Sequence, residues 1–222
     1  MHLKENHALF QREIARRGIQ HLVHFTTTIN LLSIFEQGRV LCRDAIDRLG
    51  IDCPELAPQD YIDYMDSQRL DGLTEYVNLS VERPNRFLLR TFQRRNDLSW
   101  FTWCILRINA KHIYRDSTLF SVTNAASRAA ANYGIDGSFE NFTALFQDTV
   151  ATRKHTLRRG RLPPHFTTDV QAEVLVKNAI PVEDVHQVCF RTKDNLQETR
   201  AAFSLQGFNT DNFVVTPDLF VD

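Results

Sequence analysis

Apolar positions along this chain change repeatedly between a spacing of three or four residues and strict alternation, which predicts a mixture of helices and strands. Helical spacing occurs in residues 3–17, in a short segment from Thr27 or Thr28 to Gly38, in 124–132, around 139–146 and in 195–205. Strand patterns occupy residues 20–26, 76–81, 101–108, 171–176, 185–191 and 212–216. Because these elements follow one another without a regular βαβ rhythm, we expect an α+β fold built on a largely antiparallel sheet.

Residues 101–108 give the strongest strand signal, because they are apolar on both faces, as in a central strand. Trp100 and Trp103 are therefore expected in the core. Residues 44–75 are polar and irregular, and they are long enough to form a functional loop. Three side chains of the first helix are expected to face inward: Leu9, Phe10 and Ile14.

The length of 222 residues allows one domain with a substantial core, and we predict a single domain over residues 1–222. The net charge is −1 at pH 7, so any binding of nucleic acid would need a local basic patch. No signal peptide or membrane-spanning run is seen. The four cysteines have no metal-ligand spacing, which favours reduced thiols, a cytoplasmic location and no bound metal: Cys42, Cys53, Cys104 and Cys189.

A single carboxylate interrupts the strand pattern of residues 171–176, which read Gln-Ala-Glu-Val-Leu-Val. Alternation places Glu173 and Leu175 on the face opposite Val174. Burying a carboxylate is costly unless a cation or a hydrogen-bond donor meets it. Glu173 is therefore a candidate for a charged functional site.

The densest cationic run lies just before this strand, in a loop expected over about residues 152–168. Five side chains of the run could neutralise the phosphates of a nucleic acid: Arg153, Lys154, Arg158, Arg159 and Arg161. His155 or Phe166 could stack on unpaired bases. A strand bound here would pass close to Glu173, because the loop leads directly into residues 171–176.

Five groups of motifs occur in a fixed order over about residues 20–180: His24-Phe25-Thr26 with Asn30-Leu31 and Gly38; Asp66-Ser67-Gln68-Arg69-Leu70-Asp71-Gly72; Val77-Asn78-Leu79-Ser80 with Pro84-Asn85; Thr123-Asn124-Ala125-Ala126-Ser127; and Gln171 to Val176. Together they resemble the DarT family of nucleic-acid ADP-ribosyltransferases, which are toxins of bacterial toxin–antitoxin systems. The resemblance implies an ADP-ribosyltransferase-like split antiparallel β-core flanked by helices. It also implies NAD+ as co-substrate and a macrodomain antitoxin as partner.

The same resemblance assigns roles to individual residues. His24 and Thr26 would hold the nicotinamide side of NAD+, and Asn30 and the turn around Gly38 would line that pocket. Arg69 would contact NAD+ and assist the target base, and Glu173 would be the catalytic acid. The chain departs from the family pattern in Phe120-Ser121-Val122-Thr123, where an acidic or glycine-containing turn is expected, so the target base stays open.

The chemistry agrees with these residue types. Breaking the bond between nicotinamide and ribose builds positive charge on the sugar, as in glycoside cleavage. A carboxylate about 4 Å away contributes roughly 4 kcal/mol at an effective dielectric near 20, which is about a thousandfold in rate. A guanidinium such as Arg69 could stabilise a base nitrogen that has lost its proton. A single strand is the expected target, because pairing hides that nitrogen.

We therefore expect transfer of ADP-ribose from NAD+ to thymine or guanine of single-stranded DNA. The alternatives are transfer to RNA or protein, and a non-catalytic nucleic-acid-binding module on the same fold. Simpler interpretations also stand: Glu173 as a solvent-facing acid of an edge strand, His24 as a core histidine, Arg69 in an ion pair with Asp66 or Asp71, and residues 153–161 as a solvated loop.

Overall fold

The computed structural model describes residues 2–52, 72–95, 101–152 and 155–220. Within them, seven strands form the main sheet in the order β11-β10-β4-β1-β3-β8-β5, and every neighbouring pair is antiparallel except β10 and β11. Their bounds are β1 His21–Thr27, β3 Tyr76–Val81, β4 Trp103–Asn109, β5 Leu119–Ser121, β8 Glu173–Lys177, β10 Val185–Phe190 and β11 Phe213–Val215. The predicted α+β class and largely antiparallel sheet are confirmed.

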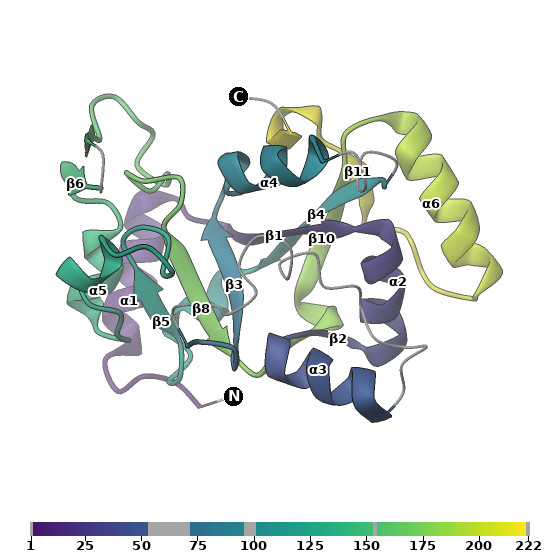
Figure 1. Ribbon diagram of the computed structural model, residues 1–222, viewed down its shortest axis with the longest axis horizontal. Coiled ribbons are helices and arrows are strands. Elements are labelled where there is room, and N and C mark those ends of the chain that lie inside the picture. The colour runs from purple at the N-terminus through teal and green to yellow at the C-terminus, as the bar shows by residue number, and fades with distance from the viewer. Residues whose placement is uncertain (1, 53–71, 96–100, 153–154, 221–222) are drawn as a thin grey trace.

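Two small sheets complete the strands: β2 Arg39–Leu41 pairs with β9 Ala179–Pro181, and β6 Thr149–Ala151 pairs with β7 Thr156–Arg158. The helices are α1 His7–Arg17, α2 Thr28–Gln37, α3 Arg43–Asp52, α4 Arg86–Gln93, α5 Phe139–Ala144 and α6 Lys193–Leu205. Short 3-10 turns are η3 Ala110–Tyr114, η4 Ala130–Asn132, η5 Val182–Asp184 and η6 Pro217–Phe220. Figure 1 shows α1 and α5 beside β5 at one end of the sheet and α6 beside β11 at the other.

Three local predictions are wrong. Residues 43–52 form α3 inside the stretch expected to be irregular, and the rest of that stretch up to residue 71 lies outside the described residues. Residues 124–132 form turns and a single 3-10 turn instead of a helix, because the side chain of Asn124 accepts a bond from Ala126 N and competes with helical bonding. Leu9 is exposed, whereas Phe10 is fully buried.

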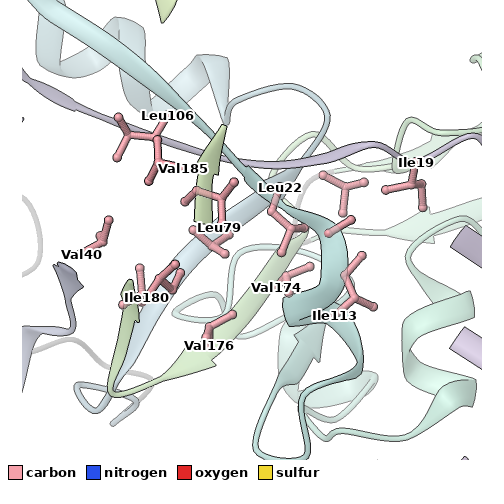
Figure 2. Close-up of a cluster of buried hydrophobic side chains, with 14 of the residues drawn as sticks. Ile19, Leu22, Val40, Leu79, Leu106, Ile113, Val174, Val176, Ile180 and Val185 are labelled. Carbon is pink, nitrogen blue, oxygen red and sulfur yellow. The ribbon is translucent and has the colours of Figure 1, made fainter. Parts of the chain in front are cut away.

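The main core lies on one face of the sheet. Figure 2 shows Leu22, Leu79 and Val174, which come from three neighbouring strands, pointing into one cluster of side chains. Each of these three is essentially inaccessible to solvent. Replacing Leu79 by Ala would cost about 2–5 kcal/mol by the usual range for buried leucines. The core therefore fixes β1, β3 and β8 relative to one another.

A smaller cluster lies on the opposite face of β1, β4 and β10 and holds α4 in place. Leu89 and Phe92 of α4 pack there against Val23 and Ile105, and the rings of Phe92 and Trp103 stack with centroids 5.9 Å apart. Asn85 caps the start of α4 by accepting a bond from Leu88 N. The first turn of α4 is thereby fixed at the end of β3.

The sheet divides between β1 and β3. These strands pair only at Leu22 with Val81 and Val23 with Ser80, whereas β1 continues to pair with β4 as far as Thr27. From His24 onward, the edge of β1 therefore leaves β3. This divergence opens the middle of the sheet, as the predicted split β-core requires.

Candidate active site

A pocket lies where β1 and β3 part, and it is lined mainly by apolar side chains with a few polar ones. Its lining comes from β1, α2, β2, α3, β3, α4, β4 and the start of β8. The polar and charged lining residues are His24, Thr26, Asn30, Arg43, Asn78, Ser80, Asn85 and Glu173. Concave, mostly apolar pockets with a few convergent polar groups are the usual form of small-molecule sites.

Glu173 begins β8 and is only 8% exposed. Alternation along β3 and β8 places Glu173 and Asn78 on the same face, opposite the main core. Glu173 Oε2 accepts bonds from the backbone N of Ala125 at 3.3 Å and from Asn78 Nδ2 at 3.5 Å. These donors compensate for burial of the carboxylate and fix its position, so the solvent-facing interpretation is wrong.

His24 lies on the other side of the split and is joined to Glu173 through a single residue. Its Nδ1 lies 3.0 Å from the carbonyl oxygen of Asn78. Because a carbonyl oxygen only accepts, Nδ1 carries the hydrogen and Nε2 is left as an acceptor. Burial lowers the pKa of His24 below its ordinary value, opposed by the bond to Asn78, so the ring is largely neutral at pH 7.

The structure brings together four of the predicted site residues in this one pocket: His24, Thr26, Asn30 and Glu173. Gly38 instead ends α2 in a left-handed conformation and does not line the pocket. Arg69 lies outside the described residues. Their predicted roles toward a ligand remain predictions.

Most of the other lining residues were not singled out from the sequence as site residues, among them Arg43, Asn78, Ser80 and Trp103. Arg43 lines the pocket and belongs to a helix where the pattern indicated irregular structure. Asn78 and Ser80 lie on the polar face of β3, and their alternation with Val77 was the available signal. Trp103 was expected to be a core residue and is indeed 8% exposed, but it also lines the pocket.

The basic loop has two kinds of arginine. Arg158 and Arg161 are exposed. Arg159 instead donates bonds to three carbonyl oxygens of its own loop, those of Phe166 at 2.7 Å, Pro163 at 2.7 Å and Pro164 at 3.1 Å. Arg159 therefore holds the loop in shape, and only Arg158 and Arg161 are presented to solvent among the described arginines of the run. Arg153 and Lys154 lie outside the described residues.

Two further residues attach this loop to the site. Buried Asp169 accepts bonds from Thr123 Oγ1 at 2.7 Å and from Gln171 N at 2.9 Å, and so links the end of the loop to the turn that contains Ala125. Arg83, which follows β3, donates from Nη2 to the carbonyl oxygen of Thr167 at 3.1 Å. The guanidinium of Arg83 also lies 4.5 Å from the centroid of the Phe166 ring, so one face of that ring is already covered.

The described residues contain no group of three or more His, Cys, Asp or Glu side chains that could hold a metal ion. In the same part of the chain, no helix is long and apolar enough to cross a membrane. A fixed, buried carboxylate that lines the same pocket as a neutral imidazole suits a reaction in which positive charge develops on a bound molecule.

Comparison with known proteins agrees with this geometry. The family model described as "ssDNA thymidine ADP-ribosyltransferase, DarT" matches residues 23–221. No curated protein sequence matches the chain significantly.

Several solved structures share the fold. The structure of Thermus sp. 2.9 DarT in complex with ADP-ribosylated ssDNA has a TM-score of 0.63 and 13% identity, covering 92% of this chain and 97% of that chain. The same protein in complex with NAD+ gives a TM-score of 0.60 and 14% identity, covering 91% and 98%. The structure of Thermosipho africanus DarTG in complex with ADP-ribose has a TM-score of 0.59 and 16% identity, covering 90% of this chain and 51% of that chain. The predicted fold is thus confirmed.

Proposed function

Because this chain belongs to the DarT family of ssDNA thymidine ADP-ribosyltransferases, we propose that Glu173 and His24 act on NAD+ in the pocket between β1 and β3. The chain is an NAD+-dependent enzyme that transfers ADP-ribose to single-stranded DNA. The observation that carries the residue assignment is the geometry of Asn78. Its side-chain nitrogen bonds the carboxylate of Glu173, and its carbonyl oxygen bonds the imidazole of His24.

In the proposed reaction, the bond between the ribose C1′ and the nicotinamide nitrogen breaks, and its electron pair leaves with nicotinamide. Glu173 lies at the pocket wall, where its negative charge stabilises the positive charge that develops on the ribose. At about 4 Å and an effective dielectric near 20, this interaction is worth roughly 4 kcal/mol. A base nitrogen of the DNA then forms the new bond to C1′ and releases its proton.

His24 and Arg43 are proposed to position the dinucleotide. The bare Nε2 of His24 can accept a hydrogen bond from a ribose hydroxyl or from the carboxamide. The guanidinium of Arg43 can bind the pyrophosphate, which is the only anionic part of NAD+. Arg69 keeps its predicted role beside the target base, where it would stabilise the nitrogen that loses its proton.

Thymine is the proposed target base, and the support is the description of the family, which names thymidine. The reactive N–H of thymine lies on its pairing edge, so an unpaired strand exposes it. Mass spectrometry of an oligonucleotide that contains all four bases, after incubation with NAD+, tests this choice. ADP-ribose on guanine and not on thymine would contradict it.

A macrodomain antitoxin that removes the modification remains the proposed partner, and the bacterial cytoplasm remains the proposed location. The support for the partner is the family and the Thermosipho africanus DarTG structure, of which the part similar to this chain makes up only 51%. The location follows from the substrates, because both NAD+ and single-stranded DNA would have to be reached inside the cell. Rescue of cell growth by co-expression of a macrodomain hydrolase tests the partner.

The test of the proposed catalytic acid is substitution of Glu173 by Gln, which removes the charge and keeps the shape. Transfer of label from NAD+ to a thymidine-containing single-stranded oligonucleotide should fall about a thousandfold. Glu198→Gln, an exposed substitution on α6, is the matched control and should transfer at the wild-type rate. Full transfer by Glu173→Gln would refute the assignment.

A further inference from the structure

Helix α4 and the segment before it carry a concentration of positive charge that the proposed reaction does not use. Residues 83–95 contain five arginines and no carboxylate, in a chain whose net charge is −1. Three of the arginines follow one another at intervals of four residues, about 6 Å apart along a helix: Arg86, Arg90 and Arg94. Helical geometry places Arg94 on the side of α4 away from the buried Leu89 and Phe92, and Arg94 is exposed. Arg86 and Arg90 lie on the flank of the helix and are half-buried.

The same face carries an aromatic side chain that the fold does not bury. Phe87 is 52% exposed, although most aromatic residues of a folded chain cover their rings. Its neighbour Arg86 lies with its guanidinium carbon 5.5 Å from the Phe87 ring centroid. An exposed ring among arginines is the arrangement with which proteins hold single strands: bases stack on the ring and guanidinium groups contact the phosphates.

The position of Phe87 connects this face to the pocket. Asn85 and Leu88, on either side of it in the sequence, both line the pocket where Glu173 lies. Arg83, at the other end of this turn, is bonded to the loop that carries Arg158 and Arg161. In Figure 1, α4 and the segment labelled β6 both lie in the upper half of the view. The turn that leads into α4 thus contributes to the pocket lining and is also bonded to the basic loop.

We propose that the outer face of α4 is a second binding surface for single-stranded DNA, on which Phe87 stacks with a base next to the modified one while Arg86 and Arg94 contact phosphates. This inference rests on the proposed function, which supplies single-stranded DNA as the ligand, and it adds the course of that strand over the surface of the protein. The strand runs from the exposed arginines of the loop, across the mouth of the pocket, onto α4. The base stacked on Phe87 would hold the neighbouring target base next to the ribose of NAD+.

The test is fluorescence anisotropy with a labelled single-stranded oligonucleotide that contains one thymidine, measured with the full chain and without NAD+. Phe87→Ala should weaken binding about 5- to 150-fold, the usual range for loss of one base–aromatic stack. Phe87→Trp should bind as tightly as wild type, whereas Phe87→Leu should be as weak as Phe87→Ala because it keeps apolar area without a ring face. Since Phe87 is exposed, all three variants should keep the wild-type melting temperature.

An abasic scan of the oligonucleotide identifies the contact itself. With an abasic site at the position that stacks on Phe87, wild type should bind as weakly as Phe87→Ala, and the variant should lose nothing more. Arg86→Ala combined with Arg94→Ala should reduce the slope of log K against log salt by about 1.4, since each phosphate contact on a single strand contributes about 0.7. Leu205→Ala and Arg12→Ala, exposed substitutions on α6 and α1, are the matched controls and should bind as wild type does.

Two results would overturn the proposal: wild-type affinity of Phe87→Leu, or a Phe87→Ala effect that no abasic position removes. The first result would mean that no base stacks on Phe87, and the exposed face of α4 would then be a candidate surface for binding another protein. Because binding is measured without NAD+, the outcome does not depend on catalysis. A wild-type chain that transfers no ADP-ribose would refute the proposed function and still leave the binding data to judge α4.

Discussion

Substitution of Asn78 by Ala tests whether its side chain supports Glu173, the proposed catalytic carboxylate. The change removes the amide that donates to Glu173 Oε2 and keeps the backbone carbonyl that bonds His24. A hydrogen bond to a charged group is worth about 1.5–3 kcal/mol. The separation of 3.5 Å exceeds the usual range for such bonds, so we expect the lower end, about 1.5 kcal/mol, or about tenfold in rate.

The assay is single-turnover transfer of ADP-ribose to a thymidine oligonucleotide by wild type, Asn78→Ala, Glu173→Ala and the double variant. We expect losses of about tenfold for Asn78→Ala and about a thousandfold for Glu173→Ala. If Asn78 acts through Glu173, its removal should cost nothing more once the carboxylate is gone, so the double variant should match Glu173→Ala. The same tenfold loss in both backgrounds would refute this reasoning.

Two further predictions concern His24 and the basic loop. Burial lowers the pKa of His24 below its ordinary 6.5. Below about pH 6.5 the unfolded chain therefore takes up a proton that the folded chain does not, and the free energy of unfolding decreases as the pH is lowered. Urea unfolding at pH 7.5 and 5.5 should therefore show a smaller loss in His24→Gln than in wild type; an equal loss would count against a buried neutral ring. In the loop, Arg159→Ala should speed cleavage by thermolysin, because it removes three bonds to loop carbonyls. Arg161→Ala should leave cleavage unchanged and lower the salt slope of oligonucleotide binding by about 0.7, and the reverse pattern would contradict these roles.

Two candidate site residues that lie on strands could be selected from the sequence, whereas Asn78, Ser80 and Trp103 could not. Glu173 and His24 each interrupt a regular apolar pattern, and such interruptions are visible without coordinates. Alternation gives the face of Glu173 but not whether that face is buried, because both sides of β8 are covered and Leu175 is as inaccessible as Val174. Only the structure shows which donors meet the carboxylate.

The parts of the site on short helices and loops were less predictable. Helix α4 has only eight residues and begins directly after Arg83-Pro84-Asn85, so its apolar pattern is too short to predict a helix. The charge of Arg159 indicated contact with a phosphate. Arg159 instead donates hydrogen bonds to carbonyl oxygens that lie within reach only in the folded loop. The same limit applies to Arg43, whose helix had too weak a pattern to be predicted.

The alignment of β3 with β8 has a consequence for how this enzyme can change. Asn78 lies opposite Leu175, and side chains alternate, so slipping β3 by one residue would put Val77 or Leu79 where Asn78 now stands. An aliphatic side chain would then replace the amide beside Glu173, and the polar side chains of Asn78 and Ser80 would point into the hydrophobic core. An inserted or deleted residue within this strand should therefore abolish catalysis and folding together, whereas point substitutions can tune the first without the second.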